Sequence, residues 1–380
     1  RESEVFMPKP IRIGVVGAGL IASSVHLPIL RRRTDLFDLR AITDLNRAAA
    51  DALAKRFAIS KVFDSTAAMY ESGEIDAVFI LNSGGHAEVA AQALDAGLDV
   101  FCEKPLAYSQ EEMELIETSW RKSGRKLMLG YMKTFDQAVY KAQERIKSRP
   151  RSVDVVVFHP SGDSQVATTD AHLETFPLSK ESLAKIEESN KKAMVDALGA
   201  DAAKAFGPEY HDIMMGSIIH ELSVLRALDV HIEKIDYVDR WPQKSRSESF
   251  IILGQTLDGV RVTIRWFYLE DYPKYQEEIR WVNEKEGHHI IFYSPYILRV
   301  PTEYIHTQRN GLDHIESSFK SYQPNFEIEL AAFAELVHTG KQQEDPIIAG
   351  KEDLLITLKM ARKICELEGI TPGGDIAKLG

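Results

Sequence analysis

Apolar, β-branched runs alternate with helix-like segments through the first third of the chain. This alternation is typical of a parallel sheet that carries helices on both faces. Gly97 and Gly124 follow two of the helix-like segments, at the place where a helix C-terminus favours a left-handed residue. The predicted strands cover residues 11–16, 39–43, 61–63, 77–81, 100–102 and 127–129.

The pattern changes from residue 134 onward. Residues 179–212 are polar and rich in Lys and Glu, which indicates one or two surface helices, and a strongly apolar helix is predicted over 213–228. Segments rich in β-branched and aromatic residues then suggest one antiparallel sheet. Its strands are predicted over 235–240, 248–256, 260–268, 278–283, 289–293 and 297–300, and closing helices over 326–338 and 354–368.

A glycine motif follows the first predicted strand directly. Gly17 permits a tight bend, Gly19 lets a pyrophosphate approach the backbone closely, and Ala22 is small enough for the helix to pack on the strand. The phosphates would meet the helix N-terminus at Leu20 and Ile21, where unpaired N–H groups and the helix dipole favour negative charge. Strand, glycine turn and helix in this order predict a Rossmann dinucleotide site.

Asp44 ends the second predicted strand, about 25 residues beyond the glycines, which is near the interval expected for a ribose-binding acid. A carboxylate there accepts hydrogen bonds from the ribose and repels a 2′-phosphate, so we expect NAD rather than NADP. Arg47 weakens this preference because it could accommodate the phosphate. Asp44 could instead be the N-cap of the following helix.

Composition narrows the class of protein. With 380 residues, 44% of them hydrophobic, the chain is long enough for two domains. The formal charge of -11 argues against a nucleic-acid partner. No apolar run approaches the roughly 20 residues that cross a bilayer, and residues 1–10 lack the apolar centre of a secretory signal. Only Cys102 and Cys365 occur, so we expect a reducing, cytoplasmic environment.

Several motifs follow the glycine turn: His26-Leu27-Pro28, His86-Ala87-Glu88, Glu103-Lys104-Pro105, Gly130-Tyr131-Met132-Lys133, the helix that carries His220, and Phe333 with Val337 and Gly340-Lys341. On these motifs the chain resembles the Gfo/Idh/MocA family, the glucose-fructose oxidoreductase and inositol dehydrogenase group, over nearly its whole length. The resemblance implies a Rossmann domain, expected in residues 1–133, and an α/β domain with a large open, mostly antiparallel sheet in 134–380. It also implies a homodimer or homotetramer assembled through that sheet.

Lys104 and His220 are the predicted catalytic residues. Hydride transfer from a carbinol needs a group that takes the hydroxyl proton and a positive charge that stabilises the developing alkoxide. A shielded Lys104 suits the second role, and His220, with an ordinary pKa near 6.5, suits the first. Lys104 could otherwise form a surface ion pair with Glu103, and His220 could be purely structural. The resemblance places both residues at the family's active site.

Gly216 departs from the family pattern, which usually has an aspartate one helical turn before the histidine. Residues four apart share a helix face, so Gly216 is expected to open a slot beside the substrate. Asp212, Glu221, His211 or Tyr131 could supply the missing carboxylate or its equivalent, or it could be absent.

Other residues are expected around the nicotinamide and the substrate. Asn82, Ser83 and His86 follow the fourth strand at the carboxyl edge, where doubly wound sheets bind ligands, although turn formation is the alternative. Glu103 is included among the cofactor-binding residues. Tyr131 and Lys133 could reach both cofactor and substrate. No metal site is expected. His211 and His220 are nine residues apart, so a continuous helix would send them to opposite faces, and neighbours in a strand, such as residues 288 and 289, also point to opposite faces.

The leading hypothesis is an NAD-dependent oxidoreductase that transfers hydride between the nicotinamide and a secondary hydroxyl of a sugar, sugar derivative or cyclitol. The alternative is a cofactor-retaining glycosidase that works by transient oxidation, elimination, hydration and re-reduction. Gly216 and the long insert over 161–210 permit a glycoside-sized substrate. A third class, a cofactor-binding sensor without catalysis, fits less well with the presence of Lys104 and His220. We expect neither a membrane nor a nucleic-acid partner.

Overall fold

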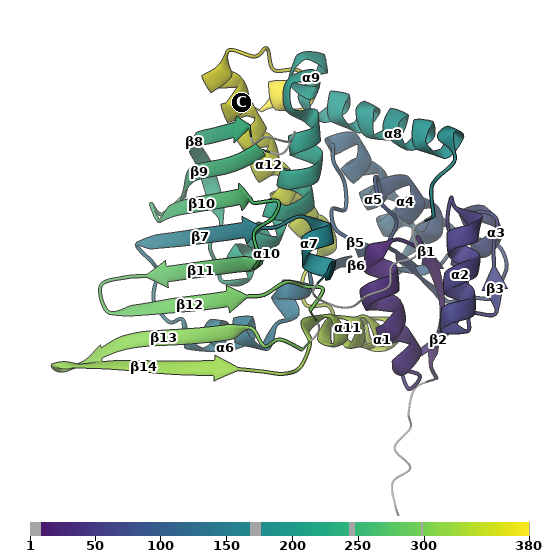
Figure 1. The fold of residues 1–380 in the computed structure, drawn as a ribbon, viewed down its shortest axis with the longest axis horizontal. Coiled ribbons are helices and arrows are strands. Elements are labelled where there is room, and N and C mark those ends of the chain that lie inside the picture. The colour runs from purple at the N-terminus through teal and green to yellow at the C-terminus, as the bar shows by residue number, and fades with distance from the viewer. Residues whose placement is uncertain (1–8, 168–175, 243–247, 298, 380) are drawn as a thin grey trace, which may run out of the picture.

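The computed structural model describes residues 9–167, 176–242, 248–297 and 299–379, and it contains two sheets that lie side by side (Figure 1). The first sheet has six strands and the second has eight. Residues 1–8, which carry most of the segment examined for a secretory signal, lie outside the described residues. Among the described helices, none has both the length and the apolarity that crossing a bilayer requires.

All strands of the first sheet run parallel, in the order β3-β2-β1-β4-β5-β6. Each predicted strand is confirmed, with its ends within two residues of the prediction. The order reverses between β1 and β4, so their carboxyl ends form the crevice in which such sheets bind ligands. The strands are β1 (Ile11–Val16), β2 (Phe37–Thr43), β3 (Lys61–Val62), β4 (Ala77–Ile80), β5 (Asp99–Glu103) and β6 (Leu127–Gly130).

Helices cover both faces of this sheet, and glycine ends α5 as the sequence predicted. Gly124 is the C-cap of α5 in the left-handed region, at φ +65°. The helices are η1 (Ala22–His26), α1 (Leu27–Arg32), α2 (Arg47–Phe57), α3 (Thr66–Tyr70), α4 (Ala87–Asp95) and α5 (Gln110–Ser123).

The C-terminal helix α11 (Asn325–Thr339) belongs to the core of the first sheet. Phe333 is fully buried, and its ring meets those of Phe79 in β4 and Phe101 in β5 edge to face, with centroids 5.3 and 5.8 Å apart. Such pairs add to the free energy gained from burial alone. The last part of the chain therefore stabilises the first sheet from beyond residue 133.

The second sheet is mixed rather than purely antiparallel, in the order β14-β13-β12-β11-β7-β10-β9-β8. β7 pairs with β10 in parallel, and the other described pairs of this sheet are antiparallel. The strands are β7 (Ser152–His159), β8 (Ile232–Pro242), β9 (Glu248–Thr256), β10 (Arg261–Tyr268), β11 (Gln276–Val282), β12 (Glu286–Phe292), β13 (Glu303–Asn310) and β14 (Asp313–Lys320).

The sequence analysis missed β7, β13 and β14, and the strand it predicted over 297–300 is wrong. Ile297, Arg299 and Val300 lie in bends, turns or irregular backbone, and position 298 lies outside the described residues. Pro295 and Pro301 flank this stretch, and proline cannot donate to a strand ladder. β7 finds its parallel partner more than 100 residues along the chain, with Ser152 opposite Arg261, so no local signal announces the pairing.

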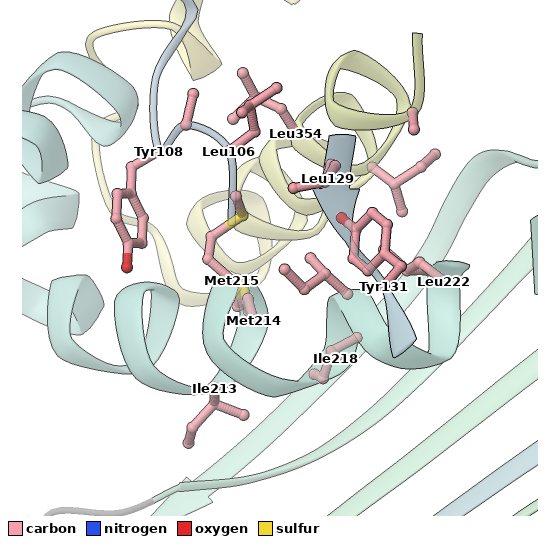
Figure 2. Close-up of a cluster of buried hydrophobic side chains, with 14 of the residues drawn as sticks. Leu106, Tyr108, Leu129, Tyr131, Ile213, Met214, Met215, Ile218, Leu222 and Leu354 are labelled. Atoms are coloured by element: carbon pink, nitrogen blue, oxygen red, sulfur yellow. The ribbon is translucent and has the colours of Figure 1, made fainter. Parts of the chain in front are cut away.

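The predicted apolar helix over 213–228 consists of a π-helix, η3 (Tyr210–Ile218), followed by α10 (Ile219–Ala227). Figure 2 shows Met214, Met215 and Ile218 directed into a cluster of buried side chains, whereas Ile213 points the opposite way. η3 therefore has one face in the core and another available to a site. The remaining elements are η2 (Met132–Phe135), α6 (Gln137–Arg145), α7 (Gly162–Ala167), α8 (Lys180–Leu198), α9 (Ala200–Glu209), α12 (Pro346–Glu368) and η4 (Ile376–Lys378).

Phe333→Ala tests whether α11 holds the first sheet together. We expect a loss of about 3–5 kcal/mol in the free energy of unfolding, because the substitution leaves a cavity between buried aromatic rings. Urea unfolding measures this, with Phe333→Leu as the control that keeps most of the apolar volume. An unchanged midpoint for Phe333→Ala would show that α11 is not part of this core.

Candidate functional site

A cavity of about 260 Å³ lies between the carboxyl end of the first sheet and the second sheet. Lys104, Lys133 and His220, three of the residues predicted from the sequence, all line it. Cavities of this kind, with a few convergent polar groups, are the usual place for a small-molecule site. The other lining residues are Met132, His159, Gly162, Gln165, Asp212, Ile213, Gly216, Ser217, Trp266, Tyr268, Tyr275, Pro295 and Tyr296.

Lys104 is positioned by buried contacts at the end of β5. Glu103 Oε2 accepts a hydrogen bond from the Lys104 backbone nitrogen at 3.2 Å, and Glu103 Oε1 lies 2.8 Å from Nε2 of the fully buried His26. The Lys104–Pro105 peptide bond is cis. Both oxygens of Glu103 are thus engaged within the protein, so Glu103 shapes the turn that carries Lys104 and does not line the cavity.

The Lys104 amine reaches across to the second part of the molecule. Its Nζ donates a hydrogen bond to the backbone oxygen of Gly216 in η3. Burial lowers the pKa of Lys104; Glu103 and Glu221 oppose this shift and Lys133 adds to it. A buried ammonium at a cavity wall interacts strongly with developing negative charge, because little water screens it.

His220 stands one turn after Gly216, at the start of α10. Burial lowers its pKa well below the usual 6.5, and the nearby charges of Lys104 and Lys133 add to the effect. Its Nδ1 atom is buried and has no hydrogen-bond partner among the described residues. The imidazole is therefore neutral at neutral pH and able to accept a proton.

Lys133 sits in a buried cluster of charges beside the cavity. Its Nζ donates to Glu277 and, at 3.4 Å, to Glu221 Oε1, and the side chains of both acids are fully buried. Tyr275 donates to Glu277 Oε2 at 2.6 Å. Burial and the neighbouring Glu277 raise the pKa of Glu221 to about 8, so Glu221 is protonated at neutral pH and one acid balances the lysine.

Four residues were considered as substitutes for the missing family carboxylate. Of these, Asp212 alone is among the described residues that line the cavity. Glu221 faces Lys133, and His211 stacks on Tyr108 with ring centroids 4.5 Å apart. Asp212 Oδ1 lies 2.7 Å from His211 Nδ1, and the Asp212 side chain is half exposed. Asp212 therefore has the placement that a substrate-binding carboxylate needs.

Tyr131 was expected near the substrate, but the structure places it elsewhere. Its hydroxyl donates to Asp353 in α12, and its ring lies beneath the guanidinium of Arg226 at 5.4 Å. Figure 2 shows the ring packed beside Leu129 and Leu222. Tyr131 lines a separate, larger cavity of about 490 Å³ that contains neither Lys104 nor His220. We assign the chemistry to the smaller cavity because the titratable groups converge there.

The loop after β4 is bound to the Lys104 turn through His86. Its ring nitrogens lie 2.7 Å from the Pro105 oxygen and 2.9 Å from the Asn82 oxygen. Ser83, which follows Asn82, is exposed. His86 is thus a buried residue that fixes the loop, and Asn82 and Ser83 are the members of this group that remain accessible at the carboxyl edge.

The glycine turn fits a pyrophosphate. Gly17 has φ +105°, and a Cβ there would lie 2.5 Å from the Asn82 backbone nitrogen, so only glycine is accommodated. A Cβ on Gly19 would meet none of the described residues within 4 Å, so the outer side of the turn is open. The helix begins at Leu20 and Ile21, where its first N–H groups are available to an anion.

Asp44 closes the same crevice and is not a helix cap. Its Oδ2 accepts from the Ala18 nitrogen at 2.7 Å and its Oδ1 from the Asn46 nitrogen at 2.6 Å. Asn46 is the N-cap of α2. The Asp44 carboxylate therefore remains beside the glycine turn, as ribose recognition requires. Arg47 forms ion pairs with Asp51 and Asp64, so its guanidinium is already engaged.

Within the described part of the insert, α8 packs against α5 and lies above the first sheet in the view of Figure 1. Asn46 Nδ2 donates to the oxygens of Phe176 and Pro177, at 3.1 and 3.0 Å, just before α8 begins. Farther along α8, Asn190 Oδ1 lies 3.4 Å from the place where a Cβ on Gly84 would be. Residues 176–198 thus connect the Asp44 end of the crevice with the loop after β4.

Comparison with known proteins shows what the first third of the chain is similar to. Residues 11–131 match the Gfo/Idh/MocA family model, which is described as "Oxidoreductase family, NAD-binding Rossmann fold". An inositol 2-dehydrogenase/D-chiro-inositol 3-dehydrogenase of Lacticaseibacillus casei is 29% identical over 139 residues, which is 36% of this chain and 40% of that protein. A D-glucoside 3-dehydrogenase of Escherichia coli K12 is 31% identical over 138 residues, 36% of this chain and 39% of that protein.

The matched segments span about two fifths of these curated family members. Solved structures extend the likeness of fold across the chain. A myo-inositol 2-dehydrogenase of Lactobacillus plantarum has a TM-score of 0.69 at 18% identity, covering 96% of this chain and 99% of that one. A UDP-N-acetylglucosamine 3-dehydrogenase of Acidithiobacillus ferrooxidans has a TM-score of 0.69 at 16% identity, covering 93% and 97%.

The sequence analysis missed His159 and Ser217, two cavity residues that lie beside Trp266. Trp266 donates its indole N–H to Ser217 Oγ at 2.9 Å, and its ring lies 5.2 Å from that of His159. Burial lowers the pKa of His159 to about 4. His159 lies on β7 and Trp266 on β10, two strands that meet only in the folded sheet. The alternation of apolar and polar residues along β10 was therefore the sole local signal for this part of the wall.

Lys133→Met tests the buried charge cluster. Removing the lysine leaves the buried Glu277 carboxylate without its cation, and we expect a loss of about 3–5 kcal/mol in the free energy of unfolding at neutral pH. Urea unfolding measures it. Glu221→Gln is the matched control, because Glu221 is already protonated there and the amide has nearly the same shape. A larger loss for Glu221→Gln than for Lys133→Met would contradict this charge assignment.

Proposed function

We propose that this protein is an NAD-dependent oxidoreductase that acts on a secondary hydroxyl of a sugar, sugar derivative or cyclitol. The observation that carries the proposal is the convergence of Lys104 and His220 on one cavity, at the carboxyl end of a dinucleotide-binding sheet. When bound, the nicotinamide would accept or return the hydride. The catalytic work of the chain then consists of holding the hydroxyl and handling its proton.

In this proposal Lys104 supplies the positive charge and His220 the base. Lys104 stabilises negative charge on the substrate oxygen, and its place is fixed by Gly216 and by the Glu103–His26 contact. His220 is held neutral by burial and by the two nearby lysines, so a ring nitrogen accepts the hydroxyl proton. Asp212 accepts hydrogen bonds from further hydroxyls, the role that position 216 cannot perform.

The cofactor preference rests on the Asp44 end of the crevice. The glycine turn, Leu20 and Ile21 would hold the pyrophosphate, and Asp44 the ribose, while the engaged guanidinium of Arg47 offers little to a 2′-phosphate. A related solved structure, a 3-ketoreductase of Actinomadura kijaniata, contains NADP, so the preference needs a direct test.

A second candidate is a cofactor-retaining glycosidase, and the insert favours it. Residues 176–198 lie along the crevice that would hold the dinucleotide, from Asn46 to the loop at Gly84. A covered cofactor leaves slowly. A net dehydrogenase must release its cofactor in every cycle, whereas a cofactor-retaining hydrolase need not release it. The aromatic wall formed by Trp266, Tyr275 and Tyr296 suits a sugar ring in either case.

Lys104→Met tests the proposed chemistry. We expect turnover to fall at least about 100-fold, the size of effect seen when a group stabilising an oxyanion is removed, while NAD affinity stays within a few-fold. NADH formation at 340 nm with a panel of sugars and cyclitols reports a dehydrogenase. Aglycone release with catalytic NAD and no accumulated NADH reports the glycosidase. Wild-type turnover by Lys104→Met would remove the catalytic role.

Asp44→Ala tests the cofactor preference. We expect NAD binding to weaken much more than NADP binding, because the ribose loses its acceptor while the repulsion of a 2′-phosphate disappears. Fluorescence titration with each dinucleotide measures the two dissociation constants. Asp44→Asn is the control that keeps one acceptor oxygen, for either the Ala18 or the Asn46 nitrogen, but removes the charge. Equal losses for both dinucleotides would refute the preference for NAD.

A further inference from the structure

Three side chains with metal-ligand chemistry meet on the second sheet, away from the cavity. Glu286 and His288 are two residues apart in β12, so both project from the same face. His288 lies directly opposite His306 of β13 in the strand register. Helix α6 packs against these strands. None of the three residues is among those that line the Lys104 cavity.

The three ligand atoms are spaced as a small cation requires. Glu286 Oε2 lies 3.2 Å from His306 Nε2 and 3.6 Å from His288 Nε2, and all three atoms lie within 4.8 Å of one another. In a tetrahedral zinc site with bonds of about 2.0–2.1 Å, neighbouring ligand atoms are about 3.3–3.4 Å apart. Small side-chain shifts therefore suffice to bring all three onto one ion.

Neighbouring groups orient two of these ligands. The Tyr304 hydroxyl lies 2.7 Å from His288 Nδ1, and the Ser148 hydroxyl donates to Glu286 Oε1 at 2.7 Å. With Nδ1 carrying the proton, His288 presents the lone pair of Nε2, and Glu286 presents Oε2. Partners of this kind, which fix the tautomer and the carboxylate, accompany most metal sites in proteins.

His288 Nε2 is the observation that points to a ligand. The His288 side chain is 1% exposed, and its Nε2 is buried without a hydrogen-bond partner among the described residues. A buried polar nitrogen that lacks a partner is costly, and native proteins usually satisfy it.

The surroundings allow an ion to enter from solvent. The side chains of Glu286 and His306 are 18% and 9% exposed, so the cluster opens toward solvent on their side. The positive charge of Arg145 lies near enough to act on His288 and would repel a bound cation. The guanidinium is engaged elsewhere, however, since its Nη1 donates a hydrogen bond to Ser317 Oγ at 2.7 Å. One carboxylate and two neutral imidazoles form a donor set that suits a borderline divalent ion.

We propose that Glu286 Oε2, His288 Nε2 and His306 Nε2 bind one Zn²⁺ ion, with water as the fourth ligand. This site departs from the expectation of no metal, which considered the His211 and His220 region and the neighbours 288 and 289. Residues 288 and 289 do face opposite ways, and the ligand that completes the set comes from the adjacent strand. The ion links β12 to β13, and Ser148 joins the segment after α6 to the same site. It is a structural site, independent of the proposed dehydrogenase chemistry.

The test uses the full chain without an affinity tag, stripped with a chelator and then titrated with Zn²⁺ by calorimetry. We expect one equivalent to bind with a micromolar or tighter dissociation constant, and thermal unfolding to shift upward on binding. Co²⁺ in place of Zn²⁺ should give visible absorption bands of a four-coordinate site. Failure of the wild-type chain to bind either ion, or binding without any thermal shift, would overturn the proposal.

Variants then assign the ligands. Glu286→Gln and His306→Gln should each weaken Zn²⁺ binding at least about 100-fold, more than the loss typical of an orienting partner. His289→Gln is the matched control, because His289 lies on the opposite face of β12, 3.0 Å from Glu278, and should bind as the wild type does. Equal binding by all three variants would place the ion elsewhere.

Circular dichroism shows whether each variant is folded, and the comparison of stripped with reloaded wild type needs no substitution at all. NAD binding is expected to be the same with and without Zn²⁺. A loss of NAD binding would therefore bear on the proposed function, whereas a loss of Zn²⁺ binding would bear on this site alone.

Discussion

The arrangement of the candidate site depends on one polar link between the two sheets, from the Lys104 amine to the Gly216 carbonyl. Behind it, Glu103 and His26 form a buried pair that leaves the Lys104 turn little freedom. Because the amine is held from the side of η3, its position depends on how the second sheet packs against the first. A glycine at 216 suits this contact, since no side chain stands beside the carbonyl.

Burial then sets the charges around the cavity. His220 is kept neutral by its surroundings and by two lysines, whereas Lys133 is neutralised by Glu277 and accompanied by a protonated Glu221. Lys104 thus remains the accessible positive charge among the titratable groups that we place at this cavity. The electrostatic pattern is that of a site prepared for negative charge on an oxygen, with a base nearby.

The second sheet contributes more than a platform for the cavity. Its β7–β10 pair supplies Trp266 and His159 to the cavity wall, and its outer strands carry the proposed zinc ligands. β7 and β10 are more than 100 residues apart in the chain, whereas β12 and β13 are consecutive strands. A single sheet therefore places two kinds of chemistry on separate pairs of strands.

Much of this was determined by the sequence. The glycine turn, Asp44 and the apolar runs of β1 to β6 are local patterns, and local backbone preference alone is enough to predict their structure. The motif around Lys104 indicated the position of the site, and the resemblance indicated that His220 would join it. Their meeting in one cavity is a statement about packing, which only the tertiary structure could supply.

Tertiary structure also decided whatever depends on the partner of a residue. Glu103, His86 and Tyr131 had the residue types of a binding site, but their partners proved to be His26, the Pro105 carbonyl and Asp353 within the protein. The β7–β10 pair joins distant segments, and the meeting of His288 with His306 depends on the register between two consecutive strands. A sequence determines what a side chain can bind, whereas the fold determines which group is within reach.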